Sequence, residues 1–204
     1  MNELQAIFDA LPVEIAPKRH SPESALPWAV RIAAYSGARL EEIAQLNTDD
    51  VREEEANGSR VWIFDIHNGD ENHKLKNETS ARLIPIHSEI IRAGLLKYLA
   101  KLPKHSPLFP GLKRRASKGN KIGARLGELF GKRLVALGIK AEGKCFHSFR
   151  HGVASRLDAA ELRQSDVARV LGHVVEGMSF GIYSQGGPGL KIVAATVERI
   201  RYDD

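Results

Sequence analysis

Apolar residues recur every three to four positions over most of the 204-residue chain, a spacing typical of helices that bury one face. We predict helices over residues 2–10, 26–36, 39–46, 88–102, 122–137, 147–160, 165–172 and 189–201. Ser88 and Ser165 are the predicted N-caps of two of them, and Gly37 and Gly172 follow two others, where glycine commonly ends a helix. Four prolines between residues 12 and 27 indicate a loop before the second helix.

The pattern changes to alternation in two short segments. Residues 60–67, RVWIFDIH, and 81–87, ARLIPIH, are rich in β-branched and aromatic residues, which is typical of strands. Residues 68–72, NGDEN, have the composition of a turn, and Pro85 indicates a sheet edge or a strand end. The sequence therefore predicts a mostly α-helical α+β fold with a small antiparallel sheet, as a single domain over residues 1–204.

Charge is unevenly distributed, although the formal net charge is only +5. Residues 113–140 contain nine basic residues and one acid, whereas residues 41–55 contain seven acids and one base. A one-sided basic block indicates a polyanionic partner such as nucleic acid, and the alternative is an ordinary solvated helix face. The loop before the basic helix supplies the expected contacts to the backbone phosphates of such a nucleic acid, which are Lys113, Arg114, Arg115, Lys118 and Lys121.

The cellular compartment is indicated by the absence of cysteine pairs, of a signal peptide and of a membrane-spanning segment in the sequence. Cys145 is the single cysteine, so a disulfide within the chain is excluded. The N-terminal segment has no signal-peptide pattern, and no apolar run approaches the roughly 20 residues of a membrane span. We therefore expect a soluble, cytoplasmic protein without a membrane partner.

The segment HSFRH, residues 147–151, concentrates groups that handle anions. In a helix, His147 shares a face with Arg150 and with His151. Arginine grips a phosphate with two donors, and histidine exchanges protons near neutral pH. This combination suits a phosphate whose oxygens gain charge during a reaction.

Three other interpretations of this segment are open. His147 and His151 could bind zinc with Cys145 or His173, although no HExxH motif is present. The same side chains could be ordinary polar residues at a helix start. Arg150 could form a buried structural ion pair with an acid of residues 41–55.

Further motifs accompany this segment in a fixed order. The sequence SGARLEE sets Arg39 and Glu42 after a helix-ending glycine, and Lys74 and Lys76 lie in the predicted hairpin. The sequence LGH sets His173 after a helix end, and GIYSQG sets Tyr183 ten residues later among glycines. In this order the motifs resemble the catalytic domain of the tyrosine recombinases, the phage integrase family, whose site is similar to that of type IB topoisomerases. The stretch from LGH to GIYSQG is similar to integrases of prophages and genomic islands.

The resemblance implies the tyrosine-recombinase fold and a specific chemistry. The implied catalytic residues are Arg39, Lys76, His147, Arg150, His173 and Tyr183. The implied reaction is site-specific DNA cleavage and rejoining through a 3′-phosphotyrosyl intermediate, with no metal, ATP or other cofactor. Glu42 is expected to orient Arg39 or its helix. Lys76 fits the family spacing better than Lys74, and in a strand only one of the two can face the site.

Tyr183 has three rivals as the nucleophile. Tyr35 and Tyr98 lie in apolar helical patterns and are expected in the core, and Tyr202 lies at a C-terminus that we expect to fray. Tyr183 alone combines the motif context with local glycines.

The resemblance also implies partners and a larger assembly. We expect double-stranded DNA attachment sites, a homo-oligomer on DNA and accessory DNA-bending proteins. Residues 1–25 are expected to be a linker from a missing N-terminal DNA-binding domain, and the alternative is a natural short form of such an integrase. Residues 189–202 are expected to form a C-terminal helix that packs on its own domain or on a neighbouring subunit. Three alternative functions are a catalytically silent DNA-binding relative, a type IB topoisomerase-like enzyme and a metal-dependent nuclease.

Overall fold

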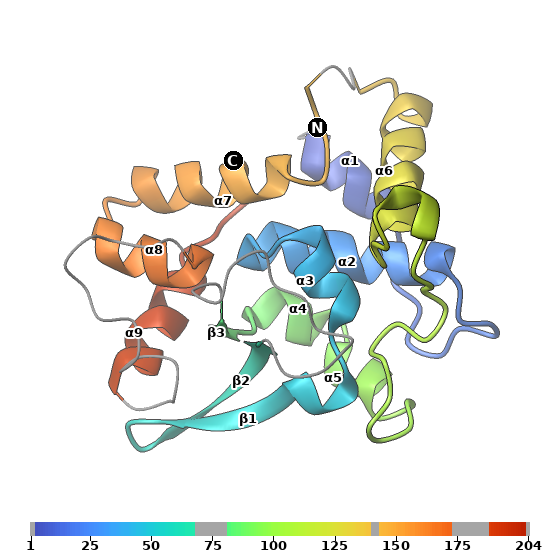
Figure 1. The fold of residues 1–204 in the computed structure, drawn as a ribbon. Coiled ribbons are helices and arrows are strands. Elements are labelled where there is room, and N and C mark those ends of the chain that lie inside the picture. The colour runs from blue at the N-terminus through green and yellow to red at the C-terminus, as the bar shows by residue number, and fades with distance from the viewer. Residues whose placement is uncertain (1–2, 68–80, 140–142, 173–187, 203–204) are drawn as a thin grey trace.

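The computed structural model describes residues 3–67, 81–139, 143–172 and 188–202. Figure 1 shows a helical domain with a small sheet along one side and helix α2 at its centre. The helices are α1 (Glu3–Ala10), α2 (Pro22–Ser36), α3 (Leu40–Gln45), α4 (Ser88–Arg92), α5 (Leu95–Leu99), α6 (Ala124–Ala136), α7 (Ser148–Ala159), α8 (Gln164–Leu171) and α9 (Pro188–Val197). The strands are β1 (Val51–Ala56), β2 (Ser59–Ile66) and β3 (Arg82–Pro85). The predicted fold class, mostly helical with a small antiparallel sheet, is confirmed.

The sheet contains a strand that the sequence analysis missed. Its order is β1-β2-β3, and both pairings are antiparallel. The tight turn between β1 and β2 is Asn57-Gly58, whose φ angles of 52° and 80° suit a two-residue hairpin turn. Glutamates dominate β1 and hide its strand character, because only Val51 and Ala56 at its ends are buried. Pro85 ends β3 at the sheet edge, as predicted.

Helix α2 forms the centre of the main hydrophobic core. It begins four residues earlier than predicted, because Ser21 caps it by accepting a hydrogen bond from the Ser24 amide at 3.3 Å. Pro22 occupies the first helical position, where no amide donor is needed. Trp28 and Ile32 are fully buried, and α2 packs against α3, α4, α6 and α7.

Two predicted caps and one predicted helix are wrong. The segment 88–102 forms two short helices, because Gly94 turns the chain with a φ of 99°. His87 rather than Ser88 is the N-cap of α4, and its ring Nδ1 accepts from the Glu89 amide at 3.0 Å. Arg163 precedes α8, so Ser165 lies inside that helix.

Both ends of the described chain pack on the domain. Leu4, Ile7 and Leu11 of the N-terminal segment are buried, and the link from residues 1–25 to a further domain stays a prediction. At the other end, α9 packs against α8, β1 and β3 of its own chain. The exchange of this helix between subunits also stays a prediction.

The tyrosines other than Tyr183 have structural roles. Tyr98 is buried and donates to the Leu108 carbonyl at 2.7 Å, and Tyr35 packs on the His87 ring at 4.6 Å. The expectation that Tyr202 lies at a frayed end is wrong. Its hydroxyl donates to the Ala34 carbonyl at 2.6 Å, and the Arg156 guanidinium lies 4.1 Å from its ring centre. Among the described residues, no helix combines the length and the apolar character that crossing a membrane requires.

We expect Gly37→Ala to destabilise the fold through packing as well as backbone strain. Gly37 has a φ of 65°, and an added Cβ would lie 2.6 Å from Leu171 Cδ2 and 3.3 Å from Val153 Cγ1. Gly138→Ala is the matched control, because its φ is 68° and nothing lies within 4 Å of the added atom. Urea unfolding should show a loss of about 1 kcal/mol for the control. The loss for Gly37→Ala should exceed it by about 1–3 kcal/mol. Equal losses would contradict the close packing of α7 and α8 on this turn.

Candidate active site

Arg39 is held by a carboxylate on the helix that follows it. The chain leaves α2 through Gly37, and Arg39 is the residue that precedes α3. The Arg39 amide donates to Glu42 Oε2 at 2.8 Å, and Arg39 Nη1 lies 2.6 Å from Glu42 Oε1. Glu42 is buried, whereas 28% of the Arg39 side chain is exposed. Glu42 therefore fixes Arg39 while leaving part of it accessible, which agrees with the orienting role expected from the sequence.

Arg82 completes this arrangement, and sequence reasoning missed it. It is the first residue of β3, and its Nη2 lies 2.9 Å from Glu42 Oε2. Its Nε donates to the Val170 carbonyl of α8 at 3.0 Å. The signal in the sequence was an arginine at the start of RLIP, a strand in which every residue is buried. A charge placed there requires an opposite charge nearby.

Arg150 links the ends of two helices. It is 5% exposed, and its Nη1 donates to the Gly37 carbonyl at 3.0 Å just beyond α2. Its Nη2 donates to the Leu171 carbonyl at the end of α8. Cations are favoured at helix C-termini, because the last carbonyls there lack partners within the helix. In the described part of the chain these carbonyl contacts, rather than a direct ion pair, hold the Arg150 guanidinium, and the nearby charge of Glu42 acts on it as well.

Positive charge exceeds negative charge in this cluster, which we define as Arg39, Glu42, Arg82 and Arg150. Burial, together with the nearby charges of Arg39 and Arg82, lowers the pKa of Arg150 to about 10. Burial alone would raise the pKa of Glu42, but the charge and hydrogen bonds of Arg82, supported by Arg39, hold it below the ordinary value of 4.5. Three guanidinium groups around one carboxylate suit the binding of an additional anion.

The histidines of HSFRH lie at the start of α7. His147 precedes the helix, and its ring centre is 4.9 Å from that of His151 in an edge-to-face arrangement. Both side chains are exposed, and His147 lies three residues before Arg150. Within the described ranges, no three His, Cys, Asp or Glu side chains form a group that could hold a metal ion. The zinc interpretation that included His173 is not tested by this observation.

Three predicted catalytic residues, Lys76, His173 and Tyr183, lie outside the described residues, as does Lys74. Two described residues close to the segments that carry them, Arg82 and Gly172, lie against each other. An added Cβ on Gly172, the residue before His173, would lie 2.9 Å from Arg82 Cδ. The structure thus brings together Arg39 and Arg150 of the predicted set, and the roles of all six residues stay predictions.

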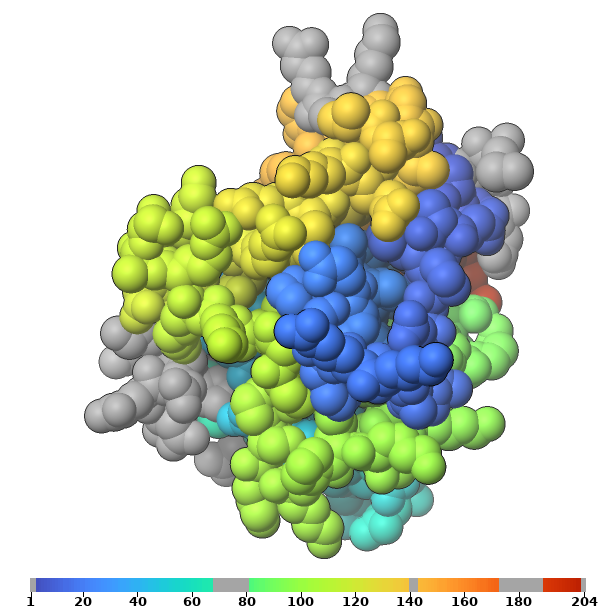
Figure 2. Space-filling view, turned by 90° about the vertical axis from the view of Figure 1, so that its right-hand side faces the viewer, coloured from blue at the N-terminus to red at the C-terminus, as the bar shows by residue number. Residues whose placement is uncertain are grey.

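The predicted DNA contacts form a projecting basic loop, residues 113–121, which precedes α6 (Figure 2). Lys113, Lys118 and Lys121 are exposed. The two arginines are partly buried: Arg114 bonds within the loop, and Arg115 ties the loop to α6. Arg114 donates to the Asn120 carbonyl at 3.1 Å, and Arg115 Nη1 lies 2.8 Å from both carboxylate oxygens of Glu128.

Glu41 connects the basic loop to the arginine cluster. Its carboxylate accepts hydrogen bonds from the amides of Ile122 at 2.8 Å and Gly123 at 2.9 Å, just before α6. Because Glu41 is next to Glu42 on α3, one short helix positions both the basic loop and Arg39.

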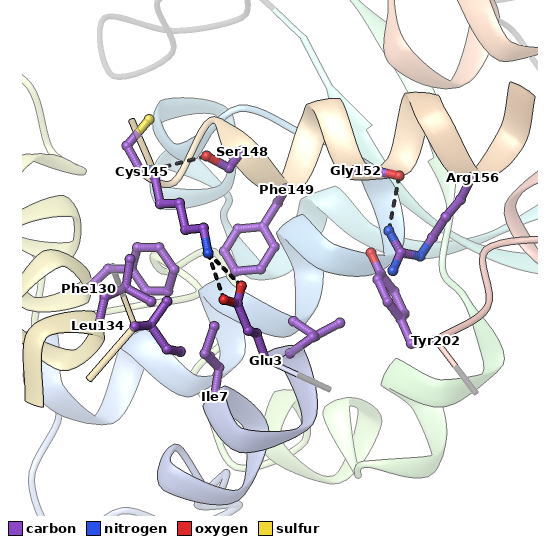
Figure 3. Close-up of a pocket in the computed structure, with 13 residues that line it drawn as sticks. Glu3, Ile7, Phe130, Leu134, Cys145, Ser148, Phe149, Gly152, Arg156 and Tyr202 are labelled. Carbon is purple, nitrogen blue, oxygen red and sulfur yellow. Dashed lines mark hydrogen bonds and ion pairs between the residues drawn. The ribbon is translucent and has the colours of Figure 1, made fainter. Parts of the chain in front are cut away.

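A separate pocket of about 230 Å³ lies between α1, α6 and α7 (Figure 3). Ile7, Phe130, Leu134 and Phe149 line it with apolar surface. The ion pair between Lys144 and Glu3 crosses one side at 2.7 Å. No residue of the arginine cluster lines this pocket, so it is distinct from the candidate site.

The fold and the cluster together define a mostly helical domain with a small antiparallel sheet and a site that carries excess positive charge. The model of the phage integrase family matches residues 2–186, and the chain belongs to this family. The solved structure of the integrase from mycobacterium phage Brujita is similar in fold, with a TM-score of 0.60 and 14% sequence identity. The match covers 96% of this chain and 56% of that integrase, so the chain spans just over half its length. Comparison with curated proteins gave no significant sequence match.

We expect Glu42→Gln to destabilise the protein by about 3–5 kcal/mol, because it leaves buried arginines without their carboxylate. Glu53→Gln is the control, since Glu53 pairs with the exposed Arg60 at 3.0 Å on the sheet surface. The control should cost less than about 1 kcal/mol in urea unfolding.

The pH dependence of the same variant tests the cause. The lowered pKa of Glu42 means that its ionised form stabilises the fold above about pH 4.5. This contribution is lost as the pH falls through the lowered pKa. The stability difference between wild type and Glu42→Gln should therefore shrink in acid, and a constant difference would contradict the ionic role of Glu42.

Proposed function

We propose that the protein is a site-specific DNA recombinase that cleaves and rejoins DNA through a 3′-phosphotyrosyl intermediate on Tyr183. The observation that carries this proposal is the cluster of Arg39, Arg82 and Arg150 around Glu42 in a member of the phage integrase family. Such a cluster binds and neutralises a phosphodiester, which otherwise repels a nucleophile. Double-stranded attachment-site DNA is the proposed substrate, in the bacterial cytoplasm.

The proposed chemistry needs no metal or ATP. The Tyr183 hydroxyl has an intrinsic pKa near 10 and needs a proton acceptor, a role we assign to His147. The oxygen of Tyr183 attacks phosphorus, and the bond from phosphorus to the 5′ oxygen breaks. Lys76 gives a proton to the departing 5′ oxygen, since a sugar alkoxide is a poor leaving group. Reversal by a 5′ hydroxyl restores the phosphodiester and frees Tyr183.

Charge stabilisation falls to the arginines and to His173. The non-bridging oxygens gain negative charge as the tyrosine attacks, and preorganised donors stabilise that charge. Arg39 is the partly exposed guanidinium of the cluster, which supports direct contact with the phosphate. Arg150 is more deeply buried and holds the ends of α2 and α8 while adding its charge.

The proposed recombination requires more than one copy of the chain. Two DNA duplexes must be held together during exchange, so we propose a homo-oligomer on DNA, assisted by accessory DNA-bending proteins. The exposed lysines of the basic loop would track the phosphate backbone without reading bases.

Covalent trapping tests the nucleophile. The protein is mixed with supercoiled DNA that carries its candidate attachment region, in the presence of a chelator, and is then denatured in detergent. We expect protein-linked DNA with wild type and none with Tyr183→Phe, with DNA binding retained. Tyr202→Phe is the matched control, because this tyrosine hydroxyl bonds to a core carbonyl, and it should still form the adduct. An adduct with Tyr183→Phe, or one abolished by the chelator, would contradict the proposed mechanism.

Salt dependence tests the basic loop. Replacing Lys113, Lys118 or Lys121 with Gln should each lower the slope of log K against log salt by about 1, if each contacts one phosphate. Lys191→Gln is the control, because this exposed lysine lies on α9, across the domain from the loop in Figure 1. An unchanged slope in all three loop variants would show that the loop does not contact the DNA backbone.

A further inference from the structure

Arg82 is buried inside the domain, yet it contacts several parts of the candidate site. It is 7% exposed, so its guanidinium cannot reach DNA from this position. Its Nη2 lies 2.9 Å from Glu42 Oε2, and its Nη1 lies 3.4 Å from Glu42 Oε1. The second of these oxygens is the one that Arg39 Nη1 contacts at 2.6 Å. Arg39 and Arg82 therefore share one carboxylate.

The sharing determines how much charge Arg39 can offer to a phosphate. Without Arg82, the negative charge of Glu42 would fall mainly on Arg39, which pairs with it directly, with Arg150 as the other nearby arginine of the cluster. With Arg82 present, three arginines and one carboxylate leave an excess of two positive charges in the cluster. Because Arg82 and Glu42 are both buried, their mutual attraction is weakly screened by water. The charge of Arg39 is the part of the cluster that solvent can reach.

The forked guanidinium of Arg82 makes a second contact, with a backbone carbonyl, in addition to its ion pair with Glu42. Its Nε donates to the Val170 carbonyl at 3.0 Å while its terminal nitrogens hold Glu42. A lysine has one nitrogen and could not span both positions. The side chain also lies against Gly172, where a Cβ would approach Arg82 Nε to 3.1 Å. Arg82 thus connects α3, which follows Arg39, to the end of α8.

We propose that Arg82 is a positioning residue for phosphoryl transfer: it neutralises Glu42, so that Glu42 fixes the geometry of Arg39 without cancelling its charge. This inference rests on the proposed function, since the phosphate is that of the scissile DNA linkage. It assigns no contact with DNA to Arg82 itself.

A variant that restores the net charge of the cluster without Arg82 distinguishes a charge-balancing role of Arg82 from a packing role. Arg82→Gln leaves an excess of one positive charge, because Glu42 then faces two arginines. The double variant Arg82→Gln/Glu42→Gln restores an excess of two, and the amide oxygen that it introduces at position 42 can still accept from Arg39. The double variant also leaves no buried charge newly unpaired, which protects its folding. Arg60→Gln is the control, since the Arg60 side chain is 78% exposed on the β1–β2 hairpin.

The first measurement is the rate of covalent adduct formation on attachment-region DNA. Arg82→Gln should be slower than wild type by about 100-fold, the cost typical of losing one charge-stabilising donor. The double variant should form the adduct at least about tenfold faster than Arg82→Gln, because the excess of two positive charges returns. The salt slope of DNA binding should stay unchanged in both, because Arg82 contacts no phosphate. Circular dichroism and urea unfolding verify that each variant is folded.

The second measurement needs no cleavage. Inorganic sulfate at millimolar concentration and constant ionic strength should raise the Tm of wild type and of Arg60→Gln. The rise should fall by about half or more in Arg82→Gln and return in the double variant. If wild type forms no adduct but sulfate gives this pattern, the proposed function fails, whereas the neutralisation of Glu42 by Arg82 in an anion-binding cluster stands. If wild type forms the adduct and Arg82→Gln reacts equally fast, the role of Arg82 fails and the function stands. A double variant no better than Arg82→Gln in both measurements would overturn the inference in favour of packing.

Discussion

The carboxylate of Glu42 is the interaction on which the site depends. A buried carboxylate is costly unless charges and hydrogen bonds compensate it, and here Arg39 and Arg82 do so from two different elements. The Arg39 amide uses the same carboxylate, which fixes the start of α3 as well as the guanidinium. One buried anion thereby sets the backbone, the orientation and the charge of the residue proposed to meet DNA.

Helix ends supply the second half of the arrangement. Arg150 donates to carbonyls at the ends of α2 and α8, and Arg82 donates to the Val170 carbonyl one residue earlier in α8. Carbonyls at a helix C-terminus have no partner within their own helix, so a buried donor from elsewhere satisfies them. Helix termini therefore hold Arg150 and, in part, Arg82, while Glu42 is the one acid that pairs with Arg39 and Arg82. This explains how positive charge accumulates there without being cancelled, at the cost of a lowered pKa for Arg150.

The sequence predicted the fold class and the elements that carry Arg39 and Arg150, because helical periodicity and motif spacing are local signals. It missed β1, because the pairing that makes Glu53, Glu54 and Glu55 a strand comes from β2. It missed Arg82, because its partner Glu42 lies 40 residues away and no local pattern joins them. The predicted N-caps Ser88 and Ser165 were wrong, because serine is only statistically favoured at such positions. At α4 the position is taken by His87, which is buried and lies 3.1 Å from the distant Ile200 carbonyl.

Helix α3 explains how DNA binding and chemistry could be coupled in so small a domain. Successive residues on a helix point about 100° apart, so Glu41 and Glu42 face different neighbours. Glu42 turns to the arginine cluster, while Glu41 accepts from two amides at the base of the basic loop. Phosphates bound by the loop lysines would therefore lie at a fixed distance from Arg39, set by a six-residue helix with both of its acids engaged. Under the proposed function, register along the DNA backbone would then be set by the same element that orients the proposed phosphate-binding arginine.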